Sequence, residues 1–488
     1  MKNKLPKQKT NFSEWYTQIV KKAGLADYGP VKGTMVIKPY GFQLWENIKD
    51  SFDLMIKQTG HVNAYFPLFI PKSFLAREAE HVEGFAKECA IVTHTRLKND
   101  QKNGVIVDPD SKLEEEIIVR PTSETVIWSM YKKWIQSYRD LPILINQWAN
   151  VVRWEMKTRL FLRTSEFLWQ EGHTAHETKE EAKKETLDIL ELYRQLAEDY
   201  LAVPVLTGEK TDSEKFAGAE KTYCIEAMMG DKRALQAGTS HNLGQNFAKA
   251  FDVKFQTKDN KEEFVWATSW GVSTRLIGAI ILTHGDDKGL RLPPKIAPVQ
   301  MVIIPISKND EDEKAIKLYL DSTIKSLKME GVRIHVDWTN NTPGYKFNEW
   351  EMKGVPLRME VGPRDIENDK VVLVRRDLGE KLFLSKIDIL SIVPELLEKI
   401  QNNLFTQAKE FRDVNTYSVT SYVEFCSIMK AGGFVRCGWD GSAKTELKIK
   451  EETKATIRCI PFDEKPEGKQ CVLSGKPAKH EVIFAKAY

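Results

Sequence analysis

Charged and aromatic side chains alternate in one stretch of this sequence, and such a pattern could bind an anionic substrate. The stretch begins at Arg153-Trp154-Glu155 and, after a polar loop, runs from Phe161 to His173. Side chains on a strand repeat every two residues, so if the stretch is a hairpin, Arg153 and Glu155 share a face. One face of the second arm then holds Arg163, Ser165, Phe167, Trp169, Glu171 and His173. This face is either exposed with ion pairs or the wall of a pocket, and the aromatic residues favour a pocket.

Arginine is suited to phosphate chemistry, because its planar fork binds two oxygens at once and stays charged. A second arginine, Arg275, stands directly before Leu276 to Leu282, a segment that is apolar all round and predicts a buried helix. An isolated arginine in such a place is usually a surface residue. A functional role for Arg275 therefore depends on the motifs around it.

Three segments that differ in sequence pattern and composition must position these residues. Residues 1–290 mix strands and helices without regular βαβ alternation, which predicts an α+β domain with a largely antiparallel sheet. Residues 291–402 begin with a proline-containing linker and alternate strand and helix, which predicts a small α/β domain. Residues 403–488 are rich in lysine and predict a small α+β domain.

Several elements can be predicted within these segments. Thr178 and Glu181 form a capping-box pair at the start of a helix whose apolar residues repeat at helical spacing. Residues 299–304 and 332–336 predict strands on either side of an amphipathic helix over 309–330.

Composition limits the class of protein. A chain of 488 residues exceeds what one hydrophobic core usually organises, and 42% hydrophobic with 29% charged residues is ordinary for a globular protein. No apolar run approaches the roughly 18 residues of a membrane helix, so we expect no membrane partner. Six scattered cysteines do not make a disulfide framework, so we expect a cytoplasmic location. The net charge of +3 requires any nucleic-acid contact to come from a local basic surface.

Motifs in a fixed order carry a family resemblance. Arg153-x-Glu155 with the later Phe167-Leu-Trp-Gln-Glu-Gly-His173 resembles motif 2 of class II aminoacyl-tRNA synthetases in its prolyl form. Other segments resemble further family motifs in the same order. In the first part of the chain they are motif 1 (60–67), the loop that holds the amino acid (120–124), a strand near the substrates (236–241) and motif 3 (271–275). Two anticodon-domain motifs (343–347 and 362–365) and the C-terminal end (484–488) follow. The sequence is therefore similar to the archaeal/eukaryotic-like prolyl-tRNA synthetases along nearly its whole length.

The resemblance implies a homodimeric ligase that uses ATP with Mg²⁺, L-proline and tRNA(Pro). Amino-acid activation brings a carboxylate against the α-phosphate of ATP, and guanidinium groups and Mg²⁺ offset the repulsion between them. By the resemblance, the catalytic residues are Arg153, at the α-phosphate and the carboxylate, and Arg275, at the γ-phosphate. The other ATP-binding residues implied are Glu155, Arg163, Thr164, Phe167, Gln236, Thr239 and Ser273.

Proline presents a secondary ammonium, a carboxylate and a small apolar ring. The residues implied for it are Thr122 and Glu124 at the amine, Trp169 and Phe216 at the ring, and Arg153, Glu171 and His241. A lone histidine is more often structural, but the Gly238-Thr239-Ser240-His241 context favours a functional His241. An apolar pocket rejects the smaller alanine by only about 1–3 kcal/mol. Because fewer than a hundred residues separate His173 from Gly271, no cis-editing domain fits, and we expect measurable mischarging of alanine.

The second segment resembles an anticodon-binding domain. Arginine can bond two guanine acceptors, and a carboxylate can accept from guanine donors. Arg375 and Arg376 are expected to contact phosphate or to face solvent. The residues implied in anticodon binding are Lys346, Glu351, Arg358, Arg364 and Asp365.

The third segment departs from relatives that bind zinc through two pairs of cysteines. Cys437 and Cys471 stand where the first member of each pair should be, but serines (Ser442 and Ser474) stand near or at the places of their partners. Serine hydroxyls are poor ligands for structural zinc, so we expect no metal here. The alternative ligands are Cys426, Cys459 and His480. The final Tyr488 is expected to reach towards the active site, as in relatives.

Two other functions remain open from the sequence. The chain could be a synthetase paralogue that binds tRNA or protein without catalysis, although such relatives usually lose a motif arginine and both Arg153 and Arg275 are present. It could also be a class II ligase for another amino acid, such as histidine, threonine or glycine. The combination of Trp169 to His173 with Thr122 to Glu124 favours proline.

Overall fold

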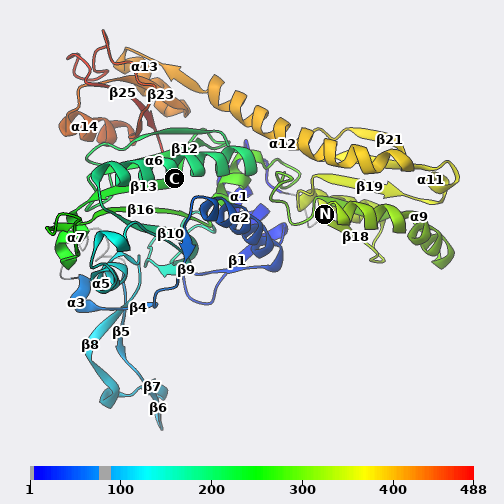
Figure 1. Cartoon of the computed structure of the whole chain (residues 1–488). Coiled ribbons are helices and arrows are strands. Elements are labelled where there is room, and N and C mark those ends of the chain that lie inside the picture. Colours follow the sequence, from blue (N-terminus) through cyan, green and yellow to red (C-terminus); the bar gives the residue numbers. More distant parts are fainter. Residues whose placement is uncertain (1–4, 76–88) are drawn as a thin grey trace.

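The computed structural model describes residues 5–75 and 89–488, and one large sheet runs through most of the body (Figure 1). Its strands are β3 (Val62–Asn63), β9 (Ile143–Val152), β10 (Glu166–His176), β11 (Val205–Glu209), β12 (Lys221–Met228), β13 (Ala234–Gly244), β16 (Trp266–Ser273), β22 (Thr416–Ser418), β23 (Phe434–Trp439), β24 (Thr456–Pro461) and β25 (His480–Ala485). Their order is β22-β23-β25-β24-β11-β12-β13-β16-β10-β9-β3. From β11 to β9 all neighbours are antiparallel, which confirms the predicted α+β class.

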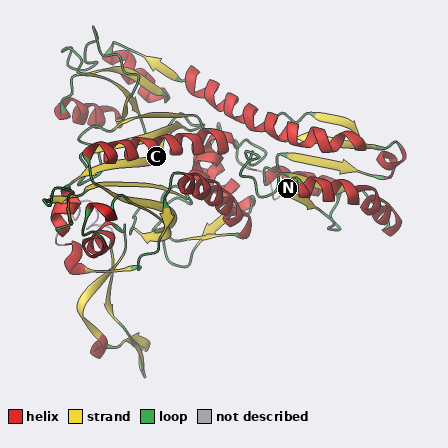
Figure 2. Ribbon diagram, viewed as in Figure 1, coloured by secondary structure: helices red, strands yellow, loops and turns green. Residues whose placement is uncertain are grey.

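Helices cover one face of this sheet (Figure 2). They are α1 (Phe12–Lys22), α2 (Pro39–Gln58), α6 (Lys179–Gln195) and α8 (Arg275–His284), and their apolar sides share one core with Trp270 and Val272 of β16. The predicted capping box is confirmed, because Glu181 N donates to Thr178 Oγ1 and Thr178 N donates back to Glu181 Oε2, both at 3.2 Å. The prediction that Leu276 to Leu282 form a buried helix is also confirmed.

A second sheet lies beside the first, in the order β18-β17-β19-β20-β21. The predicted helix appears as α9 (Asp310–Met329), with the Asn309 side chain as its N-cap. Both predicted strands begin two residues later than expected; the first ends one residue later and the second ends where predicted. The elements are β17 (Met301–Pro305), β18 (Ile334–Val336), β19 (Leu357–Val361), β20 (Lys370–Arg375), β21 (Lys381–Ser385), α9, α10 (Pro343–Met352), α11 (Pro363–Glu367) and η5 (Lys386–Asp388).

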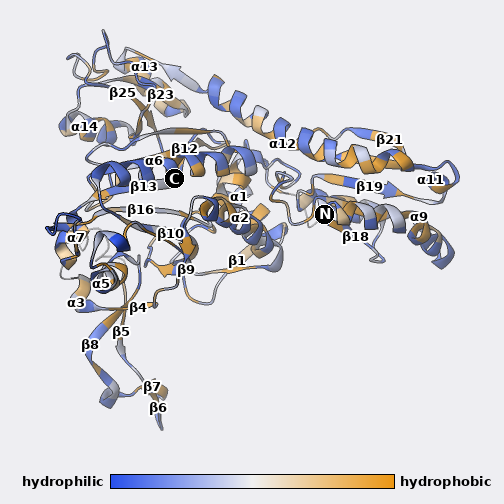
Figure 3. Cartoon of the chain, viewed as in Figure 1, coloured by the Kyte–Doolittle hydropathy of each residue, from blue (hydrophilic) through white to orange (hydrophobic). Residues whose placement is uncertain are grey.

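One long helix, α12 (Ile389–Val414), connects this second sheet to the C-terminal strands. Apolar and polar residues alternate along it (Figure 3), because one side packs on α9 and the second sheet while the other faces solvent. The boundary predicted at 402/403 therefore falls inside a continuous helix.

The C-terminal strands extend the main sheet instead of forming a separate one. Strand β24 pairs with β11, where Gly208 lies opposite Pro461 and Glu209 opposite Ile460. A Cβ atom on Gly208 would lie 2.3 Å from the carbonyl oxygen of Ile460, so the missing side chain permits this close approach. Helices α13 (Tyr422–Ala431) and α14 (Ala443–Thr453) pack on these strands.

A narrow arm of strands projects from the body (Figure 1). It contains β4 (Phe69–Pro71), β5 (Ala90–His94) and β8 (Lys112–Val119), with β6 (Leu97–Asp100) and β7 (Gly104–Val107) at its tip. The remaining elements of the described residues are β1 (Ala26–Tyr28), β2 (Met35–Ile37), α3 (Lys72–Leu75), η2 (Pro109–Ser111), α5 (Glu124–Trp134), η3 (Tyr138–Asp140), η4 (Leu196–Tyr200), α7 (Asn246–Phe251), β14 (Lys254–Gln256) and β15 (Glu262–Phe264). Of the helices in the described ranges, none has the length and apolar character to cross a bilayer.

Candidate functional site

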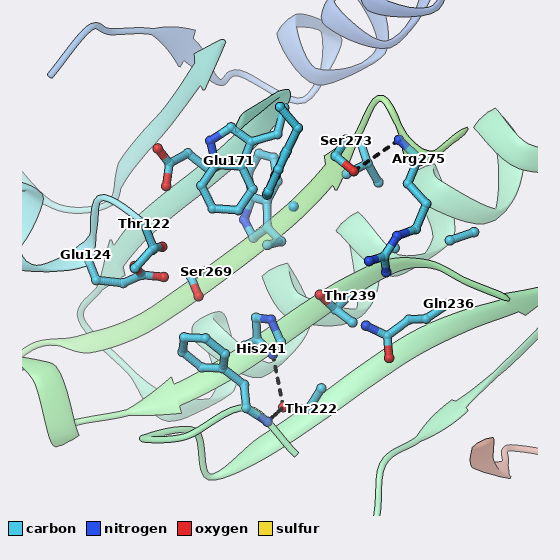
Figure 4. A pocket seen from close by; sticks show the side chains of 18 of the residues that line it. Thr122, Glu124, Glu171, Thr222, Gln236, Thr239, His241, Ser269, Ser273 and Arg275 are labelled. Atoms are coloured by element: carbon cyan, nitrogen blue, oxygen red, sulfur yellow. Dashed lines mark hydrogen bonds between the residues drawn. The ribbon is translucent and has the colours of Figure 1, made fainter. Parts of the chain in front are cut away.

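A cavity of about 310 Å³ lies on the face of the large sheet opposite α6 (Figure 4). Strand β10 divides its side chains between the two faces: Gln170 points back and accepts a 2.9 Å hydrogen bond from Tyr193 of α6, whereas Trp169 and Glu171 line the cavity. The predicted residues that line it are Thr122, Glu124, Arg153, Phe167, Trp169, Glu171, Phe216, Gln236, Thr239, His241, Ser273 and Arg275.

A second cavity of about 200 Å³ shares Arg153, Phe167, Ser273 and Arg275 with the first. It is also lined by the other three predicted residues, Glu155, Arg163 and Thr164. The two cavities together therefore collect every residue predicted for ATP and proline, from β10, β13, β16, the first residues of α5 and α8, and three loops.

Arg153 lies where the two cavities meet. Its Nε donates a 3.0 Å hydrogen bond to the carbonyl oxygen of Pro121, and its guanidinium lies 5.5 Å from the ring centroids of both Phe167 and Trp169. One edge of the guanidinium is thus fixed by backbone and its plane is supported by aromatic rings. This arrangement orients Arg153 before any substrate arrives.

Arg275 is held at the start of α8. Its Nε donates to the carbonyl oxygen of Leu162 at 3.1 Å, and its backbone N–H donates to Ser273 Oγ at 3.2 Å. Burial, followed by the nearby charges of Arg163 and Arg153, lowers the pKa of Arg275 to about 10. Arg275 stays cationic at neutral pH, and three guanidinium groups that repel one another make a site for a multiply charged anion.

The predicted hairpin is wrong in its extent. The paired strands are β9 and β10, so Arg153 and Glu155 follow the first strand, while Arg163 precedes the second. Backbone hydrogen bonds between Arg159 and Arg163 close a tight turn of their own, and they replace the ladder that would continue the hairpin. Strict alternation therefore holds only from Phe167 onward.

Glu171 is bonded entirely inside the protein. Its carboxylate accepts hydrogen bonds from Ser123 Oγ at 2.5 Å, Gln147 Nε2 at 2.7 Å and His173 Nε2 at 3.0 Å. Burial opposes its ionisation, but His173, Ser123 and Gln147 outweigh burial and lower the pKa of Glu171. The ionised Glu171 therefore ties the loop at Ser123 to β10 and shapes the cavity.

His241 lies at the apolar end of the cavity. Its Nδ1 is 2.9 Å from Thr222 Oγ1, and its ring centroid is 4.6 Å from that of Phe216. Burial lowers the pKa of His241 to about 4, so the imidazole is neutral. Nearby, Thr122 Oγ1 donates a short hydrogen bond to Glu124. The cavity thus has a carboxylate on one side and an aromatic wall on another.

Several cavity residues escaped the sequence analysis. The period of two placed His173 on the same face as Glu171, and it does line the cavity, but no binding role was assigned to it. Thr222 and Ser269 lie opposite His241 on the two neighbouring strands. Strand register depends on tertiary pairing, and no signal in the sequence gives it.

Comparisons with known proteins agree along the chain. Residues 106–284 match the tRNA synthetase class II core domain (G, H, P, S and T), 300–399 match an anticodon binding domain, and 422–488 match the prolyl-tRNA synthetase C-terminal domain. A proline–tRNA ligase of Bacteroides fragilis is 58% identical over 99% of both chains. The chain belongs to the proline–tRNA ligase family. Other members, from Cytophaga hutchinsonii and Amoebophilus asiaticus, are 56% and 55% identical over the whole of both chains.

Within this family member, Glu351 and Arg358 line a cavity of about 280 Å³ at the second sheet. The guanidinium of Arg358 lies 4.3 Å from the ring centroid of Phe347, and its Nη2 is 2.8 Å from Glu360 Oε1. A planar cation stacked on an aromatic ring beside a carboxylate can hold a flat polar group.

The other residues predicted for the anticodon lie elsewhere. Lys346 is buried, and its Nζ donates to the carbonyl oxygen of Asp337 at 2.8 Å. Arg364 and Asp365 lie on α11, where the Asp365 carboxylate accepts a 2.7 Å hydrogen bond from Gly362 N–H. The five residues thus occupy three places on the second domain.

Two further arginines take part in internal ion pairs. Arg375 Nη2 lies 2.7 Å from Asp377 Oδ2, and Arg376 Nη2 lies 2.7 Å from Asp286 Oδ1. Of the two expected alternatives, facing solvent is wrong, because each side chain is at most about a tenth exposed, whereas contact with phosphate stays a prediction. The pair of Arg376 with Asp286 instead joins the second sheet to the main body.

The C-terminal serines have partners of their own. Ser474 Oγ donates to Asp440 Oδ2 at 2.7 Å, and Ser442 N–H donates to Asp440 Oδ1 at 3.1 Å. Cys437 and Cys471 are both buried. Across residues 5–75 and 89–488, no three potential metal-ligating side chains cluster together. Whether zinc binds stays a prediction, and we expect none.

The chain terminus docks beside the site. Tyr488 N–H donates to the carbonyl oxygen of Ala234 at 3.1 Å, its hydroxyl donates to Asp231 at 2.7 Å, and its ring centroid is 5.4 Å from the Arg159 guanidinium. Ala234 begins β13, the strand that carries Gln236. Tyr488 lines neither cavity, so its expected reach towards the active site stays a prediction.

Proposed function

We propose that this chain activates L-proline with ATP and then transfers it to the 3′ end of tRNA(Pro). The observation that carries the proposal is the convergence of Arg153 and Arg275 on one cavity with an aromatic, carboxylate-bearing end. Activation requires the carboxylate of the amino acid to attack the α-phosphate of ATP. Fixed guanidinium groups offset the repulsion between these anions at no cost of reorganisation during the reaction.

Each residue predicted for the site has a role in this proposal. Arg153 bridges the proline carboxylate and the α-phosphate, and Arg275 holds the γ-phosphate, so these two are catalytic. Glu155 binds the adenine amino group and Phe167 stacks on the adenine. The remaining ATP-binding residues are Arg163, Thr164, Gln236, Thr239 and Ser273.

Proline occupies the other end of the cavity. Thr122 and Glu124 accept its ammonium, whereas Trp169 and Phe216 contact its ring. Glu171 and His241 complete this pocket. Positioning and charge stabilisation suffice for the chemistry, so no side chain acts as nucleophile or general base.

Mg²⁺ fits this site as a companion of ATP. In such sites Mg²⁺ is bound by one or two carboxylates together with substrate phosphates, and a dedicated cage of protein ligands is not needed. The lining carboxylates are too dispersed to form a cluster of metal ligands within the described part of the chain. When bound, the ion would neutralise phosphate charge, and the arginines keep the roles described above.

The proposed function also assigns a role to each domain, a quaternary state and a location. Residues 1–290 catalyse, 291–402 bind the anticodon through Lys346, Glu351, Arg358, Arg364 and Asp365, and 403–488 form a C-terminal unit without zinc. The chain works as a cytoplasmic homodimer. Residues 177–265, between β10 and β16, are occupied by helices and strands of the main body, in keeping with the absence of a cis-editing domain.

Amino-acid-dependent exchange of pyrophosphate into ATP tests the proposal. Proline should support exchange, whereas histidine, threonine and glycine should not, and charging of tRNA(Pro) should follow. Arg275→Ala should abolish proline-dependent exchange. Exchange with another amino acid in place of proline, or no exchange at all, would refute the proposed activity.

A further inference from the structure

A buried carboxylate outside the residues assigned above lies next to the nucleotide end of the site. Strand β12 pairs with β13 so that Thr222 lies opposite His241, and Glu226 lies opposite Gln236. The pairing has a bulge at this point, because Ile225 lies opposite Gly238 and the extra residue is on β13. Along β12 itself residues two apart still share a face, so the side that lines the cavity at Thr222 continues to Glu226. Glu226 is completely buried there, directly across from Gln236 of the ATP-binding set.

Two cations hold this carboxylate, and one of them comes from the far end of the chain. Lys210 Nζ lies 2.7 Å from Glu226 Oε1. Arg458 on β24 donates to both oxygens, from Nη2 to Oε1 at 2.9 Å and from Nε to Oε2 at 3.1 Å. Lys210 also donates to the carbonyl oxygen of Arg458 at 2.6 Å. The C-terminal strand is therefore fixed to β12 by a paired guanidinium and carboxylate.

Such a cluster adds little to stability by itself. Removing several charges from water costs much of what their attraction returns, and apolar replacements of buried ion pairs are often neutral or stabilising. The fork of Arg458 instead fixes the orientation of the Glu226 carboxylate in two places. The cluster is thus better suited to fixing the position of the Glu226 carboxylate than to stabilising the contact between the domains.

The cluster also acts electrostatically on the site. Burial is the main cause that lowers the pKa of Arg275, and Arg163 and Arg153 lower it further. Glu226 raises this pKa, and Arg458 lowers it by less than Glu226 raises it. The Glu226 carboxylate thus stabilises the Arg275 cation, and it lies beside the strand that carries Gln236. It can therefore affect how the nucleotide end of the cavity binds ATP.

We propose that Arg458 is a positioning residue for ATP: through Glu226 it fixes the β12–β13 strand pair at Gln236, so the C-terminal segment completes the nucleotide site. Arg458 does not touch the substrate in this arrangement. The inference rests on the proposed function, since it assigns ATP to this end of the cavity. It predicts that loss of the fork affects ATP and leaves proline unaffected, because the proline pocket lies at Thr222 and His241, farther along the same strands.

Arg458→Gln tests the inference in the full-length protein. Lys210 still neutralises Glu226 in this variant, so no unpaired charge is buried. The dissociation constant of ATP, measured by equilibrium dialysis, should rise about tenfold. This is the lower end of the loss seen in metal sites when a residue that orients a ligand is removed. The KM for proline in pyrophosphate exchange should stay within about twofold of wild type. Arg458→Lys keeps the charge but loses the fork, so it should also weaken ATP binding measurably, though by less than Arg458→Gln.

Arg436→Gln is the matched control, because Arg436 pairs with Asp463 and Glu481 within the C-terminal segment and does not reach β12. It should leave ATP binding unchanged. Equal ATP affinity in wild type and Arg458→Gln, or equal losses for ATP and proline, would overturn the inference. If Arg458→Gln is insoluble, the same comparison applies to Arg458→Lys, which should weaken ATP measurably. Wild type that binds ATP but shows no proline-dependent exchange would instead refute the proposed function.

Discussion

Substituting Gly172 by alanine should disturb the site through a clash on the opposite, helix-covered face of the sheet. Gly172 lies on β10 between Glu171 and His173, directly opposite Trp270 of β16. A Cβ atom there would lie 2.1 Å from Cζ2 of the Trp270 ring. Ordinary contacts begin at 3.4 Å, so the ring or the strand must move by more than 1 Å.

The surroundings leave little room for that movement. The Trp270 side chain is only 2% exposed, and its ring packs against His61 with centroids 5.2 Å apart and against Tyr193 at 6.5 Å. Overpacking of this kind costs about 1–3 kcal/mol. If β10 moves instead of the ring, the adjacent cavity residues move with it, and a misplacement of ~1 Å can reduce the rate about 10²-fold.

Thermal unfolding and proline-dependent exchange together measure the effect. Gly172→Ala should lower the Tm by several degrees, at about 2–4 °C per kcal/mol, and lower kcat/KM for proline by about 10²-fold. Gly344→Ala is the control, because it lies in α10 with nothing within 4 Å of a new Cβ. Alanine should be neutral or stabilising there. Wild-type Tm and activity in Gly172→Ala would refute the packing argument.

Three more predictions concern the site itself. Arg275→Lys keeps the charge but loses the bond to Leu162 and the planar fork, so the rate of exchange should fall about 10²-fold; an unchanged rate would contradict this. Burial opposes a charge on His173, but Glu171 and Glu124 outweigh it and raise its pKa above 6.5. The ion pair therefore stabilises the fold fully below pH 6.5 and loses its contribution as pH rises through the raised pKa. The Tm difference between wild type and His173→Gln should accordingly be larger at about pH 6 than at about pH 9, and an equal difference would exclude the charged pair. Alanine should support exchange with kcat/KM about 10–200-fold below that of proline, and a complete absence of alanyl-adenylate would refute the pocket-size argument.

The sequence alone determined the parts of this protein that depend on local pattern. The apolar segment after Arg275 predicted a buried helix, and Thr178 with Glu181 marked the start of another. The order of the motifs implied the family and the substrate residues, because each motif is a short segment whose residues act together.

Tertiary structure decided what depends on register and long-range pairing. Thr222 and Ser269 enter the cavity only because their strands pair opposite His241. Arg458 reaches Glu226 only because β24 pairs with β11, more than 200 residues away in the chain. Such contacts arise from the closing of long loops over a common core, and no local spacing of residues encodes them.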